Sequence, residues 1–176
     1  MGTTEEPISV LLWDQVIDAR ADEVRRLSRV QLAELATSAI EGTVELFAVP
    51  FAEFCPPPVV ELVTSATRDC RASAPEWWLA EAYLARFTDA LDAVQGLPMR
   101  PGCGPLTMAT LGLVESVTGD FEPDEVLEVL SSCYEAIVMS QLTGRVTIER
   151  ERENEQCRRA LALQQDLISR FSGGVS

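Results

Sequence analysis

Residues 123–142, PDEVLEVLSSCYEAIVMSQL, constrain the fold more than any other part of this chain. At helical spacing their apolar side chains cover nearly the whole circumference: Val126, Leu127, Val129, Leu130, Cys133, Tyr134, Ala136, Ile137, Val138, Met139 and Leu142. The polar side chains share one narrow stripe, because residues three and four apart lie on one helix face: Asp124, Glu128, Ser131, Ser132 and Glu135. A helix this apolar must be enclosed by others. We therefore predict an all-α bundle packed around residues 123–142.

Capping signals and prolines divide the rest of the chain into helices, about seven in all. Ser28 with Gln31, and Ser73 with Glu76, have the capping-box spacing, in which side chains satisfy the first backbone N–H groups of a helix. No strand pair, hairpin signal or repeat is visible. The other predicted helices cover 8–27 with a break near 19–22, 29–49, 58–71, 75–94, 105–117 and 145–171.

The length of 176 residues fits a single domain. We predict that this helical domain covers residues 8–171, with disordered tails at 1–7 and 172–176. In the final helical region, residues 149–156 are charged on every face, which favours an edge that projects into solvent. Whether this region is one helix or two is left open.

The formal net charge is −14, and its distribution is uneven. Residues 30–135 contain seventeen acidic residues and four arginines, a charge of −13. This argues against direct nucleic-acid binding and is compatible with high solubility or with a basic protein partner. The chain also has no histidine, which excludes Ser-His-Asp and Cys-His catalysis and the usual histidine zinc sites. Its fourteen positive charges are all arginine.

The expected compartment is the cytoplasm. No apolar run approaches the roughly 20 residues of a membrane span, and the acidic N-terminus is unlike a signal peptide. Five cysteines without paired spacing favour reduced thiols. We predict no cofactor and no membrane association.

Three parts of the chain together form a recognisable pattern. Residues 26–31 enter a long helix, and residues 50–54, PFAEF, follow it. The third part is the charged-then-apolar final helix, ERERENEQCRRALALQQDLISRF. This pattern resembles the YjaG-like family of uncharacterised all-helical bacterial proteins. The resemblance spans about residues 24–171 and departs from the family after Pro50, where a polar residue and a tyrosine are expected. It implies an all-helical fold and contributes no site residues.

Glu34, Glu41 and Glu45 share the polar face of the predicted helix 29–49. Such a face is usually a solvated surface. The alternative is a docking surface for a basic partner, in which case these three carboxylates are the candidate partner-binding residues.

Glu128 and Glu135 lie on the polar stripe of the central helix. If that stripe is enclosed, these carboxylates need arginine partners, for which Arg86 and Arg145 are candidates, because an unpaired buried charge costs several kcal/mol. An enclosed stripe would form the floor of a small-molecule pocket near Trp78 and Tyr83. The alternative is that the stripe faces solvent.

Cys103 is the candidate reactive thiol. It lies in Gly-Cys-Gly-Pro before a predicted helix start, where the helix dipole lowers a thiol pKa, but no histidine is available as its base. Acids also crowd the turn before the central helix, where helix-start positions explain them without a metal. No catalytic residue and no metal site is predicted.

The leading hypothesis is a non-enzymatic acidic protein that binds a basic protein partner, of the immunity or inhibitor type. The alternatives are a small-molecule-binding helical domain with a pocket near Glu128 and Glu135, and an enzyme that uses Cys103 or paired carboxylates. A homodimer is also left open.

Overall fold

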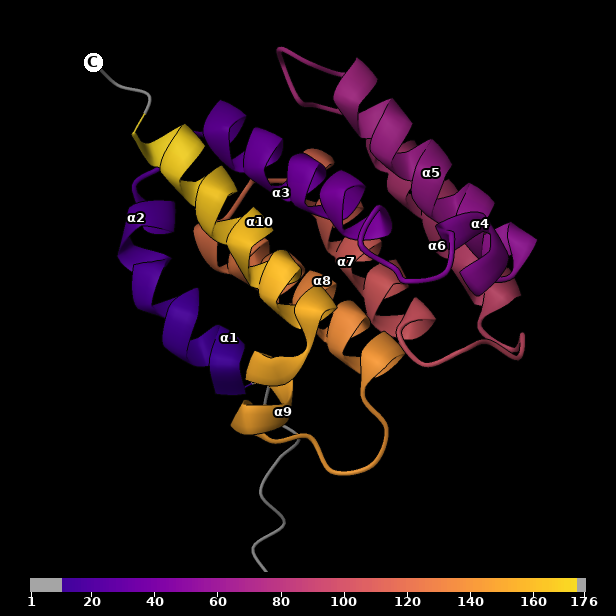
Figure 1. Ribbon diagram of the computed structural model, residues 1–176. Helices are drawn as coiled ribbons and strands as arrows, with labels where there is room; N and C mark the ends of the chain where they lie inside the picture. The colour runs from indigo at the N-terminus through magenta and orange to yellow at the C-terminus, as the bar shows by residue number, and fades with distance from the viewer. Residues whose placement is uncertain (1–10, 174–176) are drawn as a thin grey trace, which may run out of the picture.

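The computed structural model describes residues 11–173, and these residues form helices and no strands (Figure 1). The elements in chain order are α1 (Leu11–Val16), the 3₁₀ helix η1 (Asp18–Arg20), α2 (Ala21–Arg25), α3 (Arg29–Val44), α4 (Phe51–Phe54), α5 (Pro57–Ala72), α6 (Glu81–Val94), α7 (Cys103–Val117), α8 (Pro123–Gln141), α9 (Ile148–Glu153) and α10 (Glu155–Ser172). The prediction of an all-α, single-domain bundle is confirmed. The predicted tail at 1–7 lies outside the described residues, whereas α10 extends to Ser172, one residue beyond the predicted domain end.

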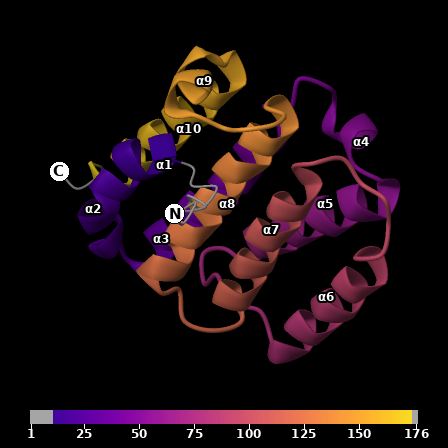
Figure 2. The same cartoon turned by 90° about the horizontal axis from the view of Figure 1, so that it is seen from below.

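The predicted central helix is α8, which packs against α7, α3, α10 and α2. Seen from below, α8 crosses the middle of the bundle, with α7 on one side and α1 and α2 on the other (Figure 2). Nine of its side chains are buried: Val126, Leu127, Val129, Leu130, Cys133, Tyr134, Ala136, Ile137 and Val138. Each fully buried aliphatic side chain contributes about 1.5–3 kcal/mol, so α8 is a main source of stability. Its polar stripe lies at the surface, where Glu128 is exposed and Glu135 is half-buried.

Local helix signals are confirmed at three starts. The Ser28 hydroxyl accepts a hydrogen bond from the Gln31 backbone N–H at 3.2 Å, and the Gln31 side chain accepts from the Ser28 backbone N–H at 2.9 Å. Pro57 and Pro123 occupy first-turn positions of α5 and α8, where a missing N–H has no cost. These positions therefore obey local rules, independent of the tertiary fold.

The second predicted capping box, at Ser73 and Glu76, does not form, and α6 begins at Glu81. The intervening turn places Trp77 at φ 53° with its indole fully buried. The Trp77 carbonyl accepts a hydrogen bond of 2.7 Å from Arg29 Nη2. Burying this large side chain outweighs the weaker preference of the turn sequence for a helix.

The final region is two helices, separated at Asn154. Thr147 caps α9 by accepting from the Arg150 backbone N–H, and Asn154 caps α10 by accepting from the Cys157 backbone N–H. The expectation that α9 projects into solvent is wrong at Glu151, which is fully buried. Its Oε1 accepts a hydrogen bond of 2.6 Å from the Tyr134 hydroxyl on α8. This contact fixes α9 against the core.

Candidate protein-binding groove

The predicted acidic face of α3 is largely occupied by a contact with α5. Arg71 of α5 donates from Nε to both carboxylate oxygens of Glu41 at 3.0 and 3.1 Å, and from Nη1 to Glu34 at 3.2 Å. The same guanidinium lies 5.7 Å from the centroid of the Trp77 ring. Of the three predicted partner-binding residues, only Glu45 is exposed. The structure therefore uses Glu34 and Glu41 to join two of its own helices.

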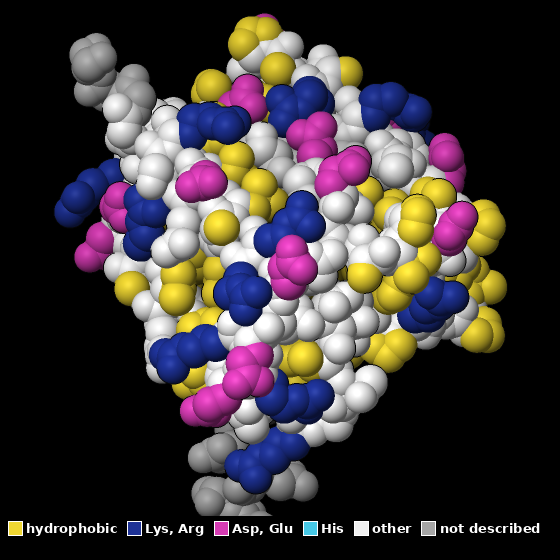
Figure 3. Space-filling view, viewed as in Figure 1, with side chains coloured by type: hydrophobic (Ala, Val, Ile, Leu, Met, Phe, Trp, Pro, Cys, Tyr) yellow, Lys and Arg dark blue, Asp and Glu magenta, His cyan; other side chains and the backbone are white. Residues whose placement is uncertain are grey.

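Arginines are interspersed with acids over the face that carries α3, α5 and α10 (Figure 3). The pairing is local in several places. Arg20 contacts Glu23 at 2.6 Å, and Arg25 contacts both Asp22 at 3.2 Å and Asp124 at 3.3 Å. The acids of these two arginine clusters are therefore paired with a guanidinium.

The four residues of the predicted small-molecule pocket do not meet. Glu128 and Glu135 lie on α8, whereas Trp78 precedes α6 and Tyr83 lies within it. The Trp78 ring is exposed beneath the Arg29 guanidinium, which lies 4.8 Å from its centroid. The pocket prediction depended on an enclosed stripe, and the stripe is at the surface.

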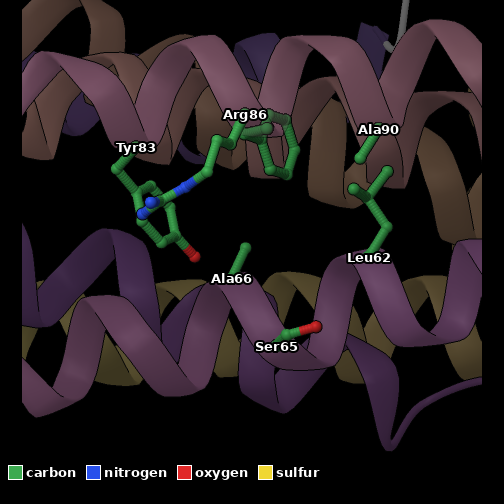
Figure 4. Close-up of a pocket in the computed structure, with 7 residues that line it drawn as sticks. Leu62, Ser65, Ala66, Tyr83, Arg86 and Ala90 are labelled. Atoms are coloured by element: carbon green, nitrogen blue, oxygen red, sulfur yellow. The ribbon is translucent and has the colours of Figure 1, made fainter.

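Tyr83 instead lines a small groove between α5 and α6, with a volume of about 160 Å³. Figure 4 shows its ring beside the Arg86 side chain, with Leu62 and Ala66 on the opposite helix. The Tyr83 hydroxyl donates to Asp69 Oδ2 at 2.8 Å, and burial together with this carboxylate raises the Tyr83 pKa well above its ordinary value. The Arg86 guanidinium lies 5.8 Å from the centroid of the Tyr83 ring. It is therefore not the ion-pair partner of the α8 carboxylates that was predicted.

A second groove lies between α7 and α8, and it brings together acids that the sequence did not single out as a group. Glu115 of α7 and Glu125 and Glu128 of α8 line it, in a volume of about 180 Å³. The apolar part of the lining includes Met108 and Leu111. Neither the turn between the helices nor the helix spacing shows which face of α7 meets α8, so the sequence offered only Glu128.

The α7–α8 groove places carboxylates of like charge close together. Partial burial raises the pKa of Glu115 above its ordinary value, and the nearby carboxylates of Glu125 and Glu128 raise it further. Within the described part of the chain, these three carboxylates accept one hydrogen bond, from the Ser116 hydroxyl to Glu125 Oε2 at 3.3 Å. None of the ion pairs among residues 11–173 involves these three glutamates. No cluster of metal-binding side chains occurs in this part of the chain either.

Close helix packing forms the floor of the groove. A Cβ at Gly112 would lie 2.9 Å from Cγ2 of Val129, so α7 and α8 approach more closely here than a side chain allows. Gly112 and Val129 therefore close the bottom of the groove, between the exposed side chain of Met108 and the acids.

The prediction of a reactive thiol at Cys103 is wrong, because Cys103 forms a disulfide with Cys55. Their Cα atoms are 6.0 Å apart, and both side chains are buried. Arg100, the arginine nearest to Cys103 in the sequence, lies with its guanidinium 5.4 Å from the centroid of the Phe54 ring. Cys103 thus has no thiol to act as a nucleophile in this state, and the expectation of five reduced cysteines is wrong for this pair. The disulfide joins the end of α4 to the start of α7.

A buried polar network on the other side of α8 was also missed. The Trp13 indole N–H donates to Gln164 Oε1 at 2.8 Å, and the Gln164 amide donates to the Leu130 carbonyl at the same distance. Burial raises the Glu151 pKa above its ordinary value. The signal was Gln164, a polar residue within the apolar stripe of α10. This network is structural, since buried polar groups need partners.

Comparisons with protein-family models, with curated proteins and with solved structures found no match. The resemblance to the YjaG-like family stays a prediction. In the described part of the chain, every helix is too short or too polar to span a membrane. The geometry of the grooves is therefore the basis for the proposal that follows.

Proposed function

We propose that this chain is a non-enzymatic acidic protein that binds another protein, and that a basic segment of the partner occupies the α7–α8 groove. One observation carries the proposal. Among residues 11–173, no arginine lines the groove in which Glu115, Glu125 and Glu128 converge, whereas Arg71 and Arg20 pair with other acids. Arg25 shares only the adjacent hollow with Glu128, and there it pairs with Asp22 and Asp124.

The energetics favour a cationic occupant. Partial burial, and then the carboxylates of Glu125 and Glu128, raise the Glu115 pKa. Because all three side chains are exposed, water screens their repulsion and the destabilisation is small. Lysine or arginine side chains from a partner would relieve this repulsion. The charge of −13 over residues 30–135 would also accelerate encounter with a basic surface. An immunity or inhibitor protein that neutralises a basic toxin is the class that fits these properties.

The alternative of a small-molecule-binding domain has less support. Ligand pockets usually have volumes of about 300–1,000 Å³. The groove beside Tyr83 has about 160 Å³ and the groove beside Glu128 about 180 Å³. Neither reaches that range. A larger hollow of about 460 Å³ lies between α2, α3 and the end of α10, and it contains none of the residues of the predicted pocket.

The proposal is tested by affinity capture from a lysate of the source organism at low salt. Three forms of the tagged protein are compared: wild type, E115Q/E125Q/E128Q, and the charge-matched control E53Q/E81Q/D92N, whose acids are exposed elsewhere. The expected result is a basic protein that the wild type and the control retain, that salt elutes, and that the groove variant loses.

Equal capture by the wild type and E115Q/E125Q/E128Q would remove the groove from the interface. Failure to capture any basic protein at low salt would count against the protein-binding function itself.

A further inference from the structure

Two exposed methionines accompany the α7–α8 groove: Met108 lines it, and Met139 lies farther along α8, away from the acids. Met108 is 52 % exposed and Met139 is 38 % exposed, and they are two of the five large hydrophobic side chains that lie exposed in residues 11–173. Methionine is flexible and polarisable, so exposed methionines adapt to apolar partner side chains of different shapes. The groove is therefore both charged and apolar.

Most of the acids lie at one end of these helix faces and the methionines lie toward the other, with Glu135 as one acidic position between Met108 and Met139. Glu128, Ser132, Glu135 and Met139 lie on one face of α8, since their spacing is three or four residues. On α7 the same rule places Met108, Gly112 and Glu115 on one face.

Contacts between the helices set their register. Gly112 lies against Val129, and Gly102 lies against Ala136 and Ser140, so α7 and α8 run antiparallel. Glu115 is therefore at the acidic end near the connecting turn. Met108 lies about 10 Å from that end and Met139 about 20 Å from it, at a rise of 1.5 Å per residue.

We infer that the occupant of this groove is a single amphipathic α-helix from another protein. Its basic residues lie at the Glu115 end and its apolar residues contact Met108 and Met139. A length of about 20 Å corresponds to about 14 residues, or four helical turns, so apolar residues about seven apart reach both methionines. This inference rests on the proposed function and adds the secondary structure and the charge pattern of the partner segment.

A helix is favoured over an extended segment by the shape of the site. Two adjacent antiparallel helices form a shallow groove that accepts a third helix along their axes, with apolar anchors at i, i+3, i+4 and i+7. An extended peptide needs unpaired backbone groups for its main-chain hydrogen bonds, and an α-helix hydrogen-bonds these groups internally.

A second copy of this chain is a poorer occupant than a different protein. The arginines of α9 and α10 alternate with Glu149, Glu153 and Glu155. Some are also engaged within the fold, because Arg150 donates to the Thr143 carbonyl at 2.8 Å and Arg158 donates to the Arg152 carbonyl at 2.8 Å. They do not form a basic end followed by an apolar stripe.

The inference is tested with a designed fluorescent peptide of about 18 residues, long enough for five turns. Arginine fills its first two turns, and leucines at helical spacing follow. A second peptide has the same arginine block, but its remaining residues are reordered to abolish the apolar stripe. Fluorescence anisotropy compares the wild type with M108S/M139S, with the apolar control V30S/L97S and with E115Q/E125Q/E128Q. Sedimentation of the protein alone at low salt measures self-association.

The expected result is that the helical peptide binds the wild type and V30S/L97S about tenfold more tightly than the reordered peptide does, and that M108S/M139S loses this advantage. Equal binding of the two peptides would overturn the helix while leaving an acidic protein-binding groove. Binding of both peptides that is unchanged in E115Q/E125Q/E128Q would overturn the proposed function as well. If the protein self-associates and E115Q/E125Q/E128Q abolishes this, the occupant of the groove is a second copy of the chain and the inference of a helix from another protein is overturned.

Discussion

The α3–α5 contact and the α7–α8 groove both bring glutamates together, but within residues 11–173 only the first is lined by an arginine. Arg71 lies between Glu34 and Glu41, so that contact is an internal ion-pair network. In the α7–α8 groove, Glu115 faces Glu125 and Glu128. The difference shows that a count of acidic residues does not locate a binding surface. The positions of the arginines decide which acids are available to a partner.

The largest expected effect concerns the floor of the groove. Gly112→Val should destabilise the protein by about 1–3 kcal/mol, because the added side chain would collide with Val129 and separate α7 from α8. Gly104→Ala is the control, since a Cβ at that helical position meets nothing within 4 Å. It should be neutral or stabilising by up to about 1 kcal/mol. Urea denaturation of both variants measures these changes, and a neutral Gly112→Val would show that the helices are not in close contact.

Removing Arg71 should leave the glutamates of the α3–α5 contact unpaired, like those of the α7–α8 groove. Arg71→Met leaves Glu34 and Glu41 adjacent and unpaired, and it also removes the contact with Trp77. The expected loss is about 1 kcal/mol of the free energy of unfolding. Arg68→Met is the matched control, because Arg68 is exposed and its contact with Asp69 is 3.7 Å long. Equal effects in the two variants would show that the α3–α5 network contributes no more than an ordinary surface pair.

Neutralising the acids should change the free energy of unfolding in opposite directions in the α3–α5 contact and in the α7–α8 groove. E115Q/E128Q should raise the free energy of unfolding by about 0.2–0.5 kcal/mol at low salt, because it removes repulsion between exposed like charges and keeps Glu125, which lies favourably in the first turn of α8. E34Q/E41Q should lower it, since Arg71 loses both partners. Thermal unfolding at low and high salt tests this contrast. Stabilisation by both variants would contradict the distinction between paired and unpaired acids.

The smallest expected effect is on the pH dependence of stability. The folded protein raises the Glu115 pKa above 4.5, so the unfolded chain releases this proton at lower pH than the folded chain does. The contribution of Glu115 to the free energy of unfolding should therefore fall as pH rises from its ordinary pKa through the folded one, and be constant above it. Glu23, whose pKa is lowered beside Arg20, contributes in the opposite direction in both proteins. Glu115→Gln should reduce that fall, whereas Glu151, whose pKa burial also raises, keeps its contribution in both proteins. Denaturation midpoints at several pH values measure the difference, and identical pH profiles would contradict it.

Local signals predicted much of the fold. The apolar pattern of α8, the Ser28 capping box and the prolines at 57 and 123 act over one or two helical turns, and the structure confirms each of them. The left-handed backbone of Trp77 escaped prediction because its cause is burial against distant helices. The same is true of the disulfide, whose cysteines are 48 residues apart.

The candidate site was less predictable than the fold. Glu128 was identified because its own helix places it on a polar stripe. Its neighbour Glu115 was missed because the meeting of α7 and α8 depends on which faces pack together. Glu34 and Glu41 were assigned to a docking surface because Arg71, 30 residues beyond Glu41, gave no local sign of reaching them. Charge pairing across helices is a tertiary property.

The most direct test of the account is hydrogen–deuterium exchange of the protein with and without the helical arginine–leucine peptide. Binding in the α7–α8 groove predicts slower exchange in α7 and α8, with α3 and α5 unchanged. Protection confined to α3 and α5, or no protection of α7 and α8 when the peptide is bound, would contradict the central claim.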